Sequence, residues 1–287
     1  MSLPINKLIN SRYIVTKLIG SGGMSEIYVA NDIYYQRTVA IKILKPEQLN
    51  KTNIARFKNE IRFASAVNNA HVEKIFNVGE YEGSPFMTYE LFRGKTVKET
   101  LDSRGKFLPL EAIDNMLQVL DGIKSIHDHE ILHNDIKPDN MMLMHDGTIK
   151  IVDFGIATHI NDSTFTNLLA SAQYVAPEVI INKNFSIQSD IYSLGITFFE
   201  FLTGKTPFMK SNTKEELAAH LNENIPSLKN YIQHNLVNEL DYVINKATNR
   251  NLLKRYKNCG EFINDLIKLK NKEPLHNKGF FAKLFQK

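Results

Sequence analysis

The chain has 287 residues, enough for one large domain or two smaller ones. Apolar residues make up 43% and charged residues 23%, which excludes a disordered or collagen-like chain. Cys259 is the one cysteine, so no intrachain disulfide can form, and the net charge of +4 is too small to indicate nucleic-acid binding.

Cysteine usage favours a reducing compartment, and we expect a cytoplasmic protein. The first residues lack a basic region followed by an apolar run, so no signal peptide is expected. The most apolar stretch, residues 191–202, is too short to span a bilayer and contains Glu200.

The first third of the sequence is typical of β-strands. Apolar and β-branched runs predict strands at residues 12–19, 26–31, 38–44, 74–81 and 86–91. We interpret them as an antiparallel meander. A helix is expected at about residues 53–67, where apolar side chains recur on one face.

The rest of the sequence is typical of helices. Thr96 and Glu99 have the spacing of a capping box, in which the two side chains satisfy free amide groups at a helix start. Thr213 and Glu216 repeat this spacing. Gly204 is interpreted as a helix stop rather than as the end of a phosphate-binding loop.

Together these elements predict an α+β fold with two lobes. A small β-rich lobe should cover residues 1–92 and a larger, mostly helical lobe residues 93–272, followed by a basic and aromatic tail at 273–287. The larger lobe should contain a long helix beginning at Pro109 and a buried helix at 191–202.

Two features of the first lobe combine residue types that bind phosphates. A glycine-rich turn at residues 20–25 would let backbone amides approach a phosphate, and it would allow positive φ in a tight hairpin. Lys42 is the one lysine carried by an apolar strand, and Glu60 flanks the apolar face of the following helix. Taken alone, Lys42 fits an edge lysine better, and Glu60 fits a solvated flank as well as a partner for Lys42.

The decisive segments lie in the larger lobe. They are His-Asn-Asp-Ile-Lys-Pro-Asp-Asn at 133–140, Asp-Phe-Gly at 153–155 and Ala-Pro-Glu at 176–178. Phosphoryl transfer needs a carboxylate that orients the acceptor hydroxyl and takes its proton, and a lysine that neutralises the transferred group. It also needs oxygen ligands for Mg²⁺, which an amide and a second carboxylate supply.

In this order the motifs resemble those of eukaryotic-type (Hanks) serine/threonine protein kinases over almost the whole chain. The Gly-Gly-Met-Ser segment at 22–25 is similar to bacterial members in particular. The resemblance implies a bilobal protein-kinase-like fold. It also implies transfer of the γ-phosphoryl of ATP to Ser or Thr hydroxyls of protein substrates, with Mg²⁺.

The resemblance assigns catalytic roles residue by residue. Asp135 would be the catalytic base, and Lys137 would lie near the γ-phosphate. Lys42 would contact the α- and β-phosphates and pair with Glu60. Ser171 stands where serine/threonine kinases have a hydroxyl that binds the base and the second lysine.

The resemblance also implies ligand-binding positions. Asn140 and Asp153 would hold Mg²⁺. The residues that would bind ATP are Ile19, Gly20, Ser21, Gly22, Gly23, Met24, Ser25, Glu26, Ile27, Ala40, Lys42, Glu90, Phe92 and Met142. Tyr89 would be the gatekeeper.

Two structural contacts follow from the same resemblance. Asp190, at the start of the buried helix, would brace the catalytic loop. Glu178 and Arg255 would form an ion pair within the larger lobe.

The sequence departs from the family pattern at Asn134, where most of these kinases have an Arg that pairs with a phosphate on the activation loop. We therefore expect weaker dependence on loop phosphorylation. Thr164 and Thr166 stand where bacterial relatives autophosphorylate, which would need self-association. They fit ordinary loop hydroxyls equally well.

Three other interpretations concern single parts of the sequence or the activity of the whole fold. His129 and His133 match a zinc-protease pattern, but that motif needs both on one helical face. The serious alternative is a nucleotide-binding, pseudokinase-like signalling scaffold with the same fold. Residues 280–285 suit a weak membrane-surface contact or a partner groove, although a short capping helix or a frayed end is preferred.

Overall fold

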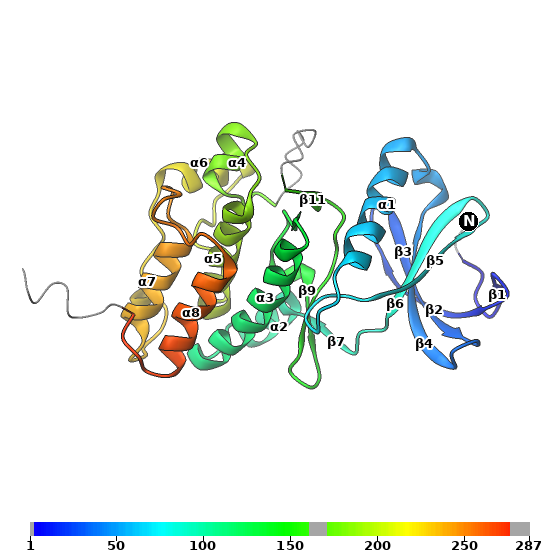
Figure 1. The fold of residues 1–287 in the computed structure, drawn as a ribbon, viewed down its shortest axis with the longest axis horizontal. Helices are drawn as coiled ribbons and strands as arrows, with labels where there is room; N and C mark the ends of the chain where they lie inside the picture. Colours follow the sequence, from blue (N-terminus) through cyan, green and yellow to red (C-terminus); the bar gives the residue numbers. More distant parts are fainter. Residues whose placement is uncertain (1–2, 161–170, 276–287) are drawn as a thin grey trace, which may run out of the picture. The chain divides into compact units, whose positions relative to one another are not determined.

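The structure is a computed structural model that describes residues 3–160 and 171–275 (Figure 1). The chain divides into two compact units, residues 1–95 with 142–157, and residues 96–141 with 158–287. The expected lobe boundary at residue 92 and the tail from residue 273 stay predictions. Segment 142–157 groups with the first unit, although the sequence placed it in the larger lobe.

An antiparallel sheet forms most of the first unit. Its strands are β1 (Leu8–Ile9), β2 (Tyr13–Ser21), β3 (Ser25–Asp32), β4 (Arg37–Leu44), β5 (Ile75–Tyr81) and β6 (Ser84–Glu90). Their order in the sheet is β1-β2-β3-β4-β6-β5. The expected simple meander is therefore wrong beyond β4, because β6 pairs with β4 and leaves β5 at the edge.

Helix α1 (Lys51–Ala66) packs against β5 and β6. Asn50 caps its start, because the Asn50 side chain accepts a hydrogen bond from the Asn53 amide. Between sheet and helix, Ala40, Leu44, Phe57, Met87 and Tyr89 form one buried cluster. The alternation of apolar residues in β4 and β6 thus fixes which side chains face the helix.

A small second sheet joins segment 142–157 to the first unit. It contains β7 (Gly94–Thr96), β9 (Met141–Met144) and β10 (Ile149–Ile151), in the order β10-β9-β7. A Cβ on Gly94 would lie 2.1 Å from the carbonyl oxygen of Leu143, so β7 approaches β9 this closely only with glycine.

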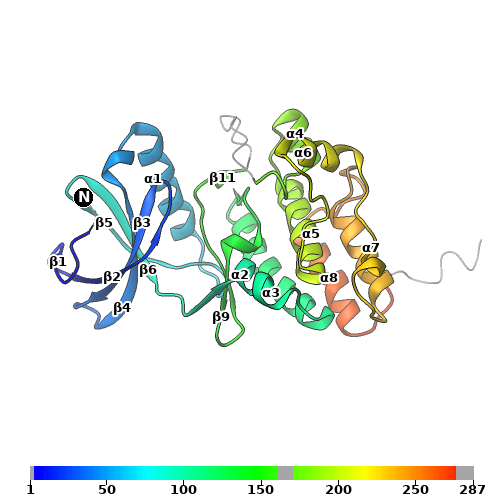
Figure 2. The ribbon, with the colours of Figure 1, turned by 180° about the vertical axis from the view of Figure 1, so that it is seen from behind.

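The second unit is mostly helical, with its central helices seen from both sides in Figures 1 and 2. Its helices are α2 (Val97–Arg104), α3 (Pro109–Asp128), α4 (Pro177–Asn182), α5 (Ile187–Thr203), α6 (Thr213–Asn222), α7 (Val237–Ala247) and α8 (Cys259–Lys270). A two-stranded ribbon pairs β8 (Ile131–Leu132) with β11 (Thr158–His159). Helix α3 packs on α5 and α8, and α5 packs on α7.

Helix α5 lies at the centre of this unit, as predicted. Every residue from 189 to 202 is buried, which is why its apolar side chains extend around the helix. Each buried Phe or Leu there contributes about 1.5–3 kcal/mol relative to exposure. Gly204 ends the helix with φ +78°, confirming the predicted stop.

The two predicted capping boxes have different outcomes. Thr96 and Glu99 form one at the start of α2, with distances of 3.0 and 2.8 Å between the bonded atoms. The prediction for Thr213 is wrong. Asn212 is the capping residue of α6 and accepts from the Glu215 amide, because an Asn one position earlier offers the same acceptor.

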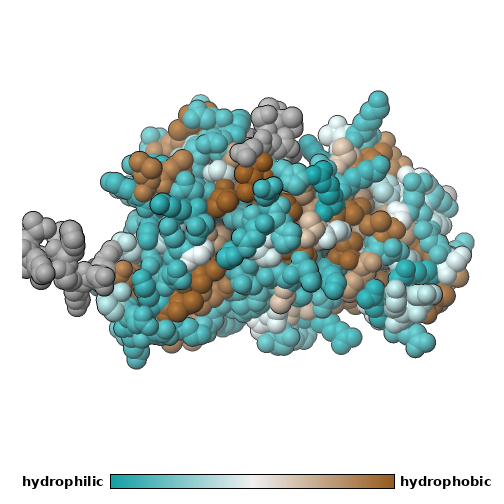
Figure 3. All heavy atoms as spheres, in the orientation of Figure 1, coloured by the Kyte–Doolittle hydropathy of each residue, from teal (hydrophilic) through white to brown (hydrophobic). Residues whose placement is uncertain are grey.

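The exposed face shown in Figure 3 is mostly hydrophilic, with separate hydrophobic patches. Within residues 3–160 and 171–275, no helix combines the length and apolar character that a membrane crossing requires.

Candidate active site

The predicted catalytic loop lies directly after β8 and is held by the buried helix α5. The carboxylate of Asp190 accepts hydrogen bonds from the backbone amides of His133 (2.9 Å) and Asn134 (3.0 Å). Asp190 is only 1% exposed. A buried carboxylate bonded to two successive amides fixes the backbone just before Asp135.

Asp135 is the centre of a hydrogen-bonded group. Its carboxylate accepts from the Lys137 ammonium at 2.7 Å and from the Ser171 hydroxyl at 2.9 Å. Lys137 also donates to Ser171, at 2.7 Å. The side-chain amide of Asn140 donates to the Asp135 carboxylate at 2.9 Å and to its backbone carbonyl at 2.8 Å. The structure thus brings four residues singled out from the sequence into one cluster.

Lys42 is the centre of a second cluster, within the first unit. Its ammonium forms an ion pair with Glu60 and lies 3.9 Å from the carboxylate of Asp153. Burial alone would lower the pKa of Lys42, but the charges of Glu60 and Asp153 outweigh it and raise that pKa above its ordinary value. Lys42 therefore stays a cation in an otherwise buried environment.

Sequence reasoning missed Glu73, which belongs to the Lys42 cluster. Its carboxylate accepts a hydrogen bond from the Asp153 amide at 3.1 Å, and the residue is 4% exposed. Burial, followed by the negative charge of Glu60, raises the pKa of Glu73 to about 8. A single carboxylate beside an apolar run looks like a solvated residue, so no sequence pattern distinguished it.

The glycine-rich turn joins β2 to β3, as predicted. Ile19, Gly20 and Ser21 end β2; Ser25, Glu26 and Ile27 begin β3. None of the glycines at 20, 22 and 23 has φ in the left-handed region, so this turn does not use the positive φ that glycine allows. A Cβ on Gly23 would meet nothing within 4 Å, which leaves the space that a close backbone approach needs.

Several residues expected to bind ATP, and the expected gatekeeper, belong to or pack against one buried cluster of the first unit. Ala40 and Tyr89 belong to it, and Met24, Ile27 and Phe92 pack against it. At the end of β6, the Glu90 carboxylate lies 3.4 Å from the Lys150 ammonium, and the half-buried Met142 lies in β9.

Two structural expectations match the geometry of the second unit. Arg255 forms a bidentate ion pair with Glu178 at 2.6 and 3.1 Å, and its side chain is fully buried. His133 follows β8 rather than a helix and is fully buried, so His129 and His133 do not share a helical face. The zinc-protease pattern is therefore accidental.

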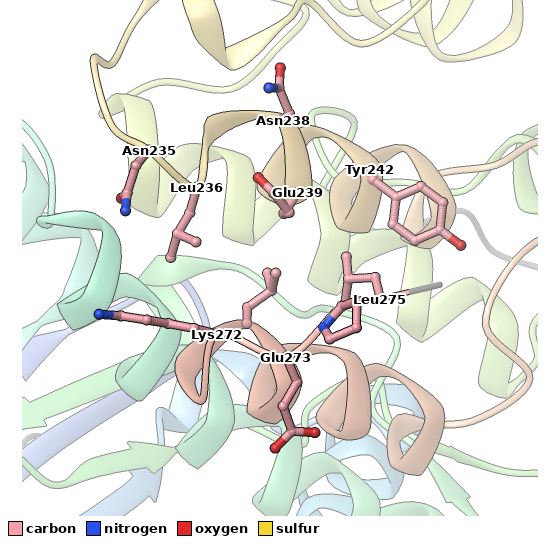
Figure 4. A pocket seen from close by; sticks show the side chains of 10 residues that line it. Asn235, Leu236, Asn238, Glu239, Tyr242, Lys272, Glu273 and Leu275 are labelled. Atoms are coloured by element: carbon pink, nitrogen blue, oxygen red, sulfur yellow. The ribbon is translucent and has the colours of Figure 1, made fainter. Parts of the chain in front are cut away.

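Among the hollows of the second unit, two differ in their relation to the predicted site. One, of about 360 Å³, is lined in part by Lys137, Asp139 and Ser171, next to the catalytic loop. The other, of about 670 Å³, lies between α7 and the end of α8, and Figure 4 shows Tyr242 on one side and Lys272 on the other. None of the predicted site residues lines the larger hollow.

Some predictions fall on residues outside the described part of the chain. These are the loop hydroxyls Thr164 and Thr166 and the aromatic segment at 280–285. They stay predictions.

Comparison with known proteins agrees with this arrangement. The family profile described as "Protein kinase domain" matches residues 13–278. The chain is 35% identical over 280 residues to the serine/threonine-protein kinase PrkC of Bacillus subtilis, covering 96% of this chain and 43% of PrkC. It is 33% identical over 269 residues to a probable serine/threonine-protein kinase PknB of Lactococcus lactis, covering 92% and 43%.

A third relative is the serine/threonine-protein kinase PknB of Mycobacterium tuberculosis, 30% identical over 276 residues, covering 93% of this chain and 44% of that protein. The chain thus spans less than half the length of the curated relatives described here.

Proposed function

The chain belongs to the protein kinase domain family, and on that premise we propose that it is a protein-serine/threonine kinase. It transfers the γ-phosphoryl group of ATP to Ser or Thr hydroxyls of protein substrates. Relatives named serine/threonine kinases, with 30–35% identity over most of this chain, support the assignment.

The hydrogen-bonded group around Asp135 is the observation that carries this proposal. A carboxylate at this position orients the acceptor hydroxyl and takes its proton. Lys137 offers a positive charge to the phosphoryl group in transit, and Ser171 fixes both side chains by bonding to each. The hollow lined by Lys137 and Ser171 offers space for an acceptor side chain.

The Lys42 cluster supports nucleotide binding by the first unit. Glu60 holds the Lys42 ammonium in place, which lets it neutralise phosphate oxygens at little entropic cost. We assign the α- and β-phosphates to Lys42 and the adenine to the surface around Ala40, Ile27 and Met142.

The donor set fits Mg²⁺, which prefers oxygen ligands and retains several waters. Asn140 uses its amide nitrogen towards Asp135, which leaves its amide oxygen available as a ligand. The carboxylate of Asp153 is 49% exposed and can reach a hydrated ion. When bound, Mg²⁺ would neutralise phosphate charge, and Asn140 and Asp153 are the residues that would hold it.

Several finer features belong to the same proposal. Asn134 donates a hydrogen bond to the Thr158 hydroxyl at 3.0 Å, an interaction that needs no phosphate, and this supports weak dependence on loop phosphorylation. We also propose autophosphorylation at Thr164 or Thr166 through self-association. The protein would work in the cytoplasm with ATP and Mg²⁺. Its tail would make weak contact with a membrane surface.

The test is incubation of the purified chain with γ-labelled ATP and Mg²⁺, beside Asp135→Asn and the exposed control Asp128→Asn. We expect label on Ser or Thr in the wild type and in Asp128→Asn. Asp135→Asn should lose about 10²–10⁴-fold in rate, the usual contribution of general base catalysis. Bound ATP without transfer in any of the three proteins would instead indicate a pseudokinase-like scaffold.

A further inference from the structure

Glu73 is held beside the Asp-Phe-Gly segment by its own backbone. The Glu73 amide donates to the Ile151 carbonyl at 2.9 Å, and the Ile151 amide donates to the His71 carbonyl at 2.9 Å. Val72 and Ile151 form a parallel bridge. This backbone pairing carries the Glu73 side chain to the position of Asp153, 80 residues later in the chain.

Asp153 adopts a backbone conformation that needs support. Its φ of +69° lies in the left-handed region, which residues with a Cβ adopt only where neighbours hold them. Two hydrogen bonds do so: the Asp153 amide donates to Glu73 at 3.1 Å, and the Gly155 amide donates to the Asp153 carboxylate at 3.1 Å. The first hydrogen bond holds the backbone of Asp153, and the second holds its side chain.

The Glu73 side chain is buried next to charged groups. The carboxylate is buried in the cluster that holds Lys42, Glu60 and Asp153, with the Tyr89 ring close enough for the Glu73 charge to affect its pKa. An oxygen of either the ionised or the protonated carboxyl group can accept from the Asp153 amide. The contact therefore does not depend on the charge state.

We propose that Glu73 is a positioning residue that holds Asp153 in its left-handed conformation and so aims the Asp153 carboxylate. This inference rests on the proposed function, in which Asp153 is a magnesium ligand. Glu73 itself touches neither the metal nor the nucleotide in this proposal.

The test compares Glu73→Gln, which keeps an acceptor oxygen, with Glu73→Leu, which removes it. Thr88→Val is the matched control, because it deletes a different buried hydrogen bond of the first unit, the one that the Thr88 hydroxyl donates to the Asn77 carbonyl. The first readout is hydrogen exchange of the Asp153 amide without nucleotide. The second is the affinity for ADP with and without Mg²⁺.

We expect a slowly exchanging Asp153 amide in the wild type, in Glu73→Gln and in Thr88→Val. Glu73→Leu should accelerate this exchange by about tenfold or more. It should weaken ADP binding by about tenfold with Mg²⁺ and leave metal-free ADP binding unchanged.

Fast exchange of the Asp153 amide in the wild type would overturn the proposal, even if Glu73→Leu failed to fold. So would equal effects of Glu73→Leu and Thr88→Val, because general loosening of the unit would then explain both. The exchange readout needs no phosphoryl transfer. A chain that protects Asp153 through Glu73 but transfers no phosphate would refute the proposed function and leave this inference standing.

Discussion

At the scale of single residues, Ser171 is the side chain that links Asp135 to Lys137. Its hydroxyl donates to Asp135 and accepts from Lys137, so it fixes the distance between a base and a cation. Without this hydroxyl the side chains of Asp135 and Lys137 could adopt more rotamers. Fewer molecules would then hold both groups in the arrangement that phosphoryl transfer needs, so the rate of transfer should fall.

We predict that Ser171→Ala lowers kcat by about tenfold with little change in KM for ATP, whereas Ser171→Thr keeps most of the activity. Threonine retains the hydroxyl that makes both bonds. Steady-state kinetics of the two variants checks this. Equal kcat values for the Ala and Thr variants would show that the hydroxyl has no part in the rate.

The residues that cluster around Asp135 could be picked out from the sequence because most of them form one contiguous pattern. Asp135, Lys137 and Asn140 stand within six residues, and their identities and spacing were sufficient to find them. Glu73 could not be found from the sequence, because its hydrogen bond is to a partner 80 residues away. No local pattern reports such a contact.

At the scale of elements, the end of α5 shows how closely two backbones can approach. Gly204 has φ +78°, and a Cβ there would lie 1.8 Å from the carbonyl oxygen of Gly105. Both the conformation and the space therefore require glycine.

We predict that Gly204→Ala destabilises the protein by about 2–4 kcal/mol, since a steric overlap adds to the cost of a left-handed alanine. Gly147→Ala is the control: φ is +85°, but a Cβ would meet nothing within 4 Å, so about 1 kcal/mol is expected. Urea unfolding measures both. Equal losses would mean that the close approach to Gly105 is unimportant.

Element-level prediction succeeded for long periodic segments and failed for short ones. Helices α3 and α5 were expected from their apolar patterns, and Pro109 and Gly204 marked one end of each. Strands of two to four residues, such as β8 and β10, carry too few side chains for a recognisable period.

At the scale of the whole molecule, stability should depend on pH through a buried group of α3, α5 and α8. His127 is bonded to Asp190 at 2.9 Å and lies 3.7 Å from the Cys259 sulfur. Burial alone would lower the pKa of His127, but the hydrogen bonds to Asp190 and Cys259 outweigh it and raise this pKa to about 10.

Because the folded pKa lies above the unfolded value of 6.5, the contribution of His127 is complete below pH 6.5 and is lost as pH rises through about 10. The loss is at most about 1.4 kcal/mol per pH unit within that window. We predict that the free energy of unfolding falls less steeply over this range in His127→Asn than in the wild type. Parallel slopes in urea unfolding at pH 6, 8 and 10 would contradict the assignment.

At this scale the α+β class, with a β-rich part and a mostly helical part, could be predicted from the sequence, whereas the pairings of segment 142–157 could not. Segment 142–157 belongs to the first unit because β9 pairs with β7 and Ile151 pairs with Val72. Such pairings join distant parts of the sequence, so the division at residue 92 could not anticipate them.

We propose that this chain transfers the γ-phosphoryl group of ATP to Ser or Thr, with Asp135 as the base that takes the proton of the acceptor hydroxyl. The most direct measurement is the initial rate of transfer from ATP, with Mg²⁺, to three peptide mixtures that differ only in a fixed Ser, Thr or Tyr acceptor. We predict that the Ser or Thr mixture reacts at least about tenfold faster than the Tyr mixture, and that Asp135→Asn abolishes the difference by losing about 10²–10⁴-fold in rate. Preferred transfer to Tyr, or equal rates for wild type and Asp135→Asn, would contradict the claim.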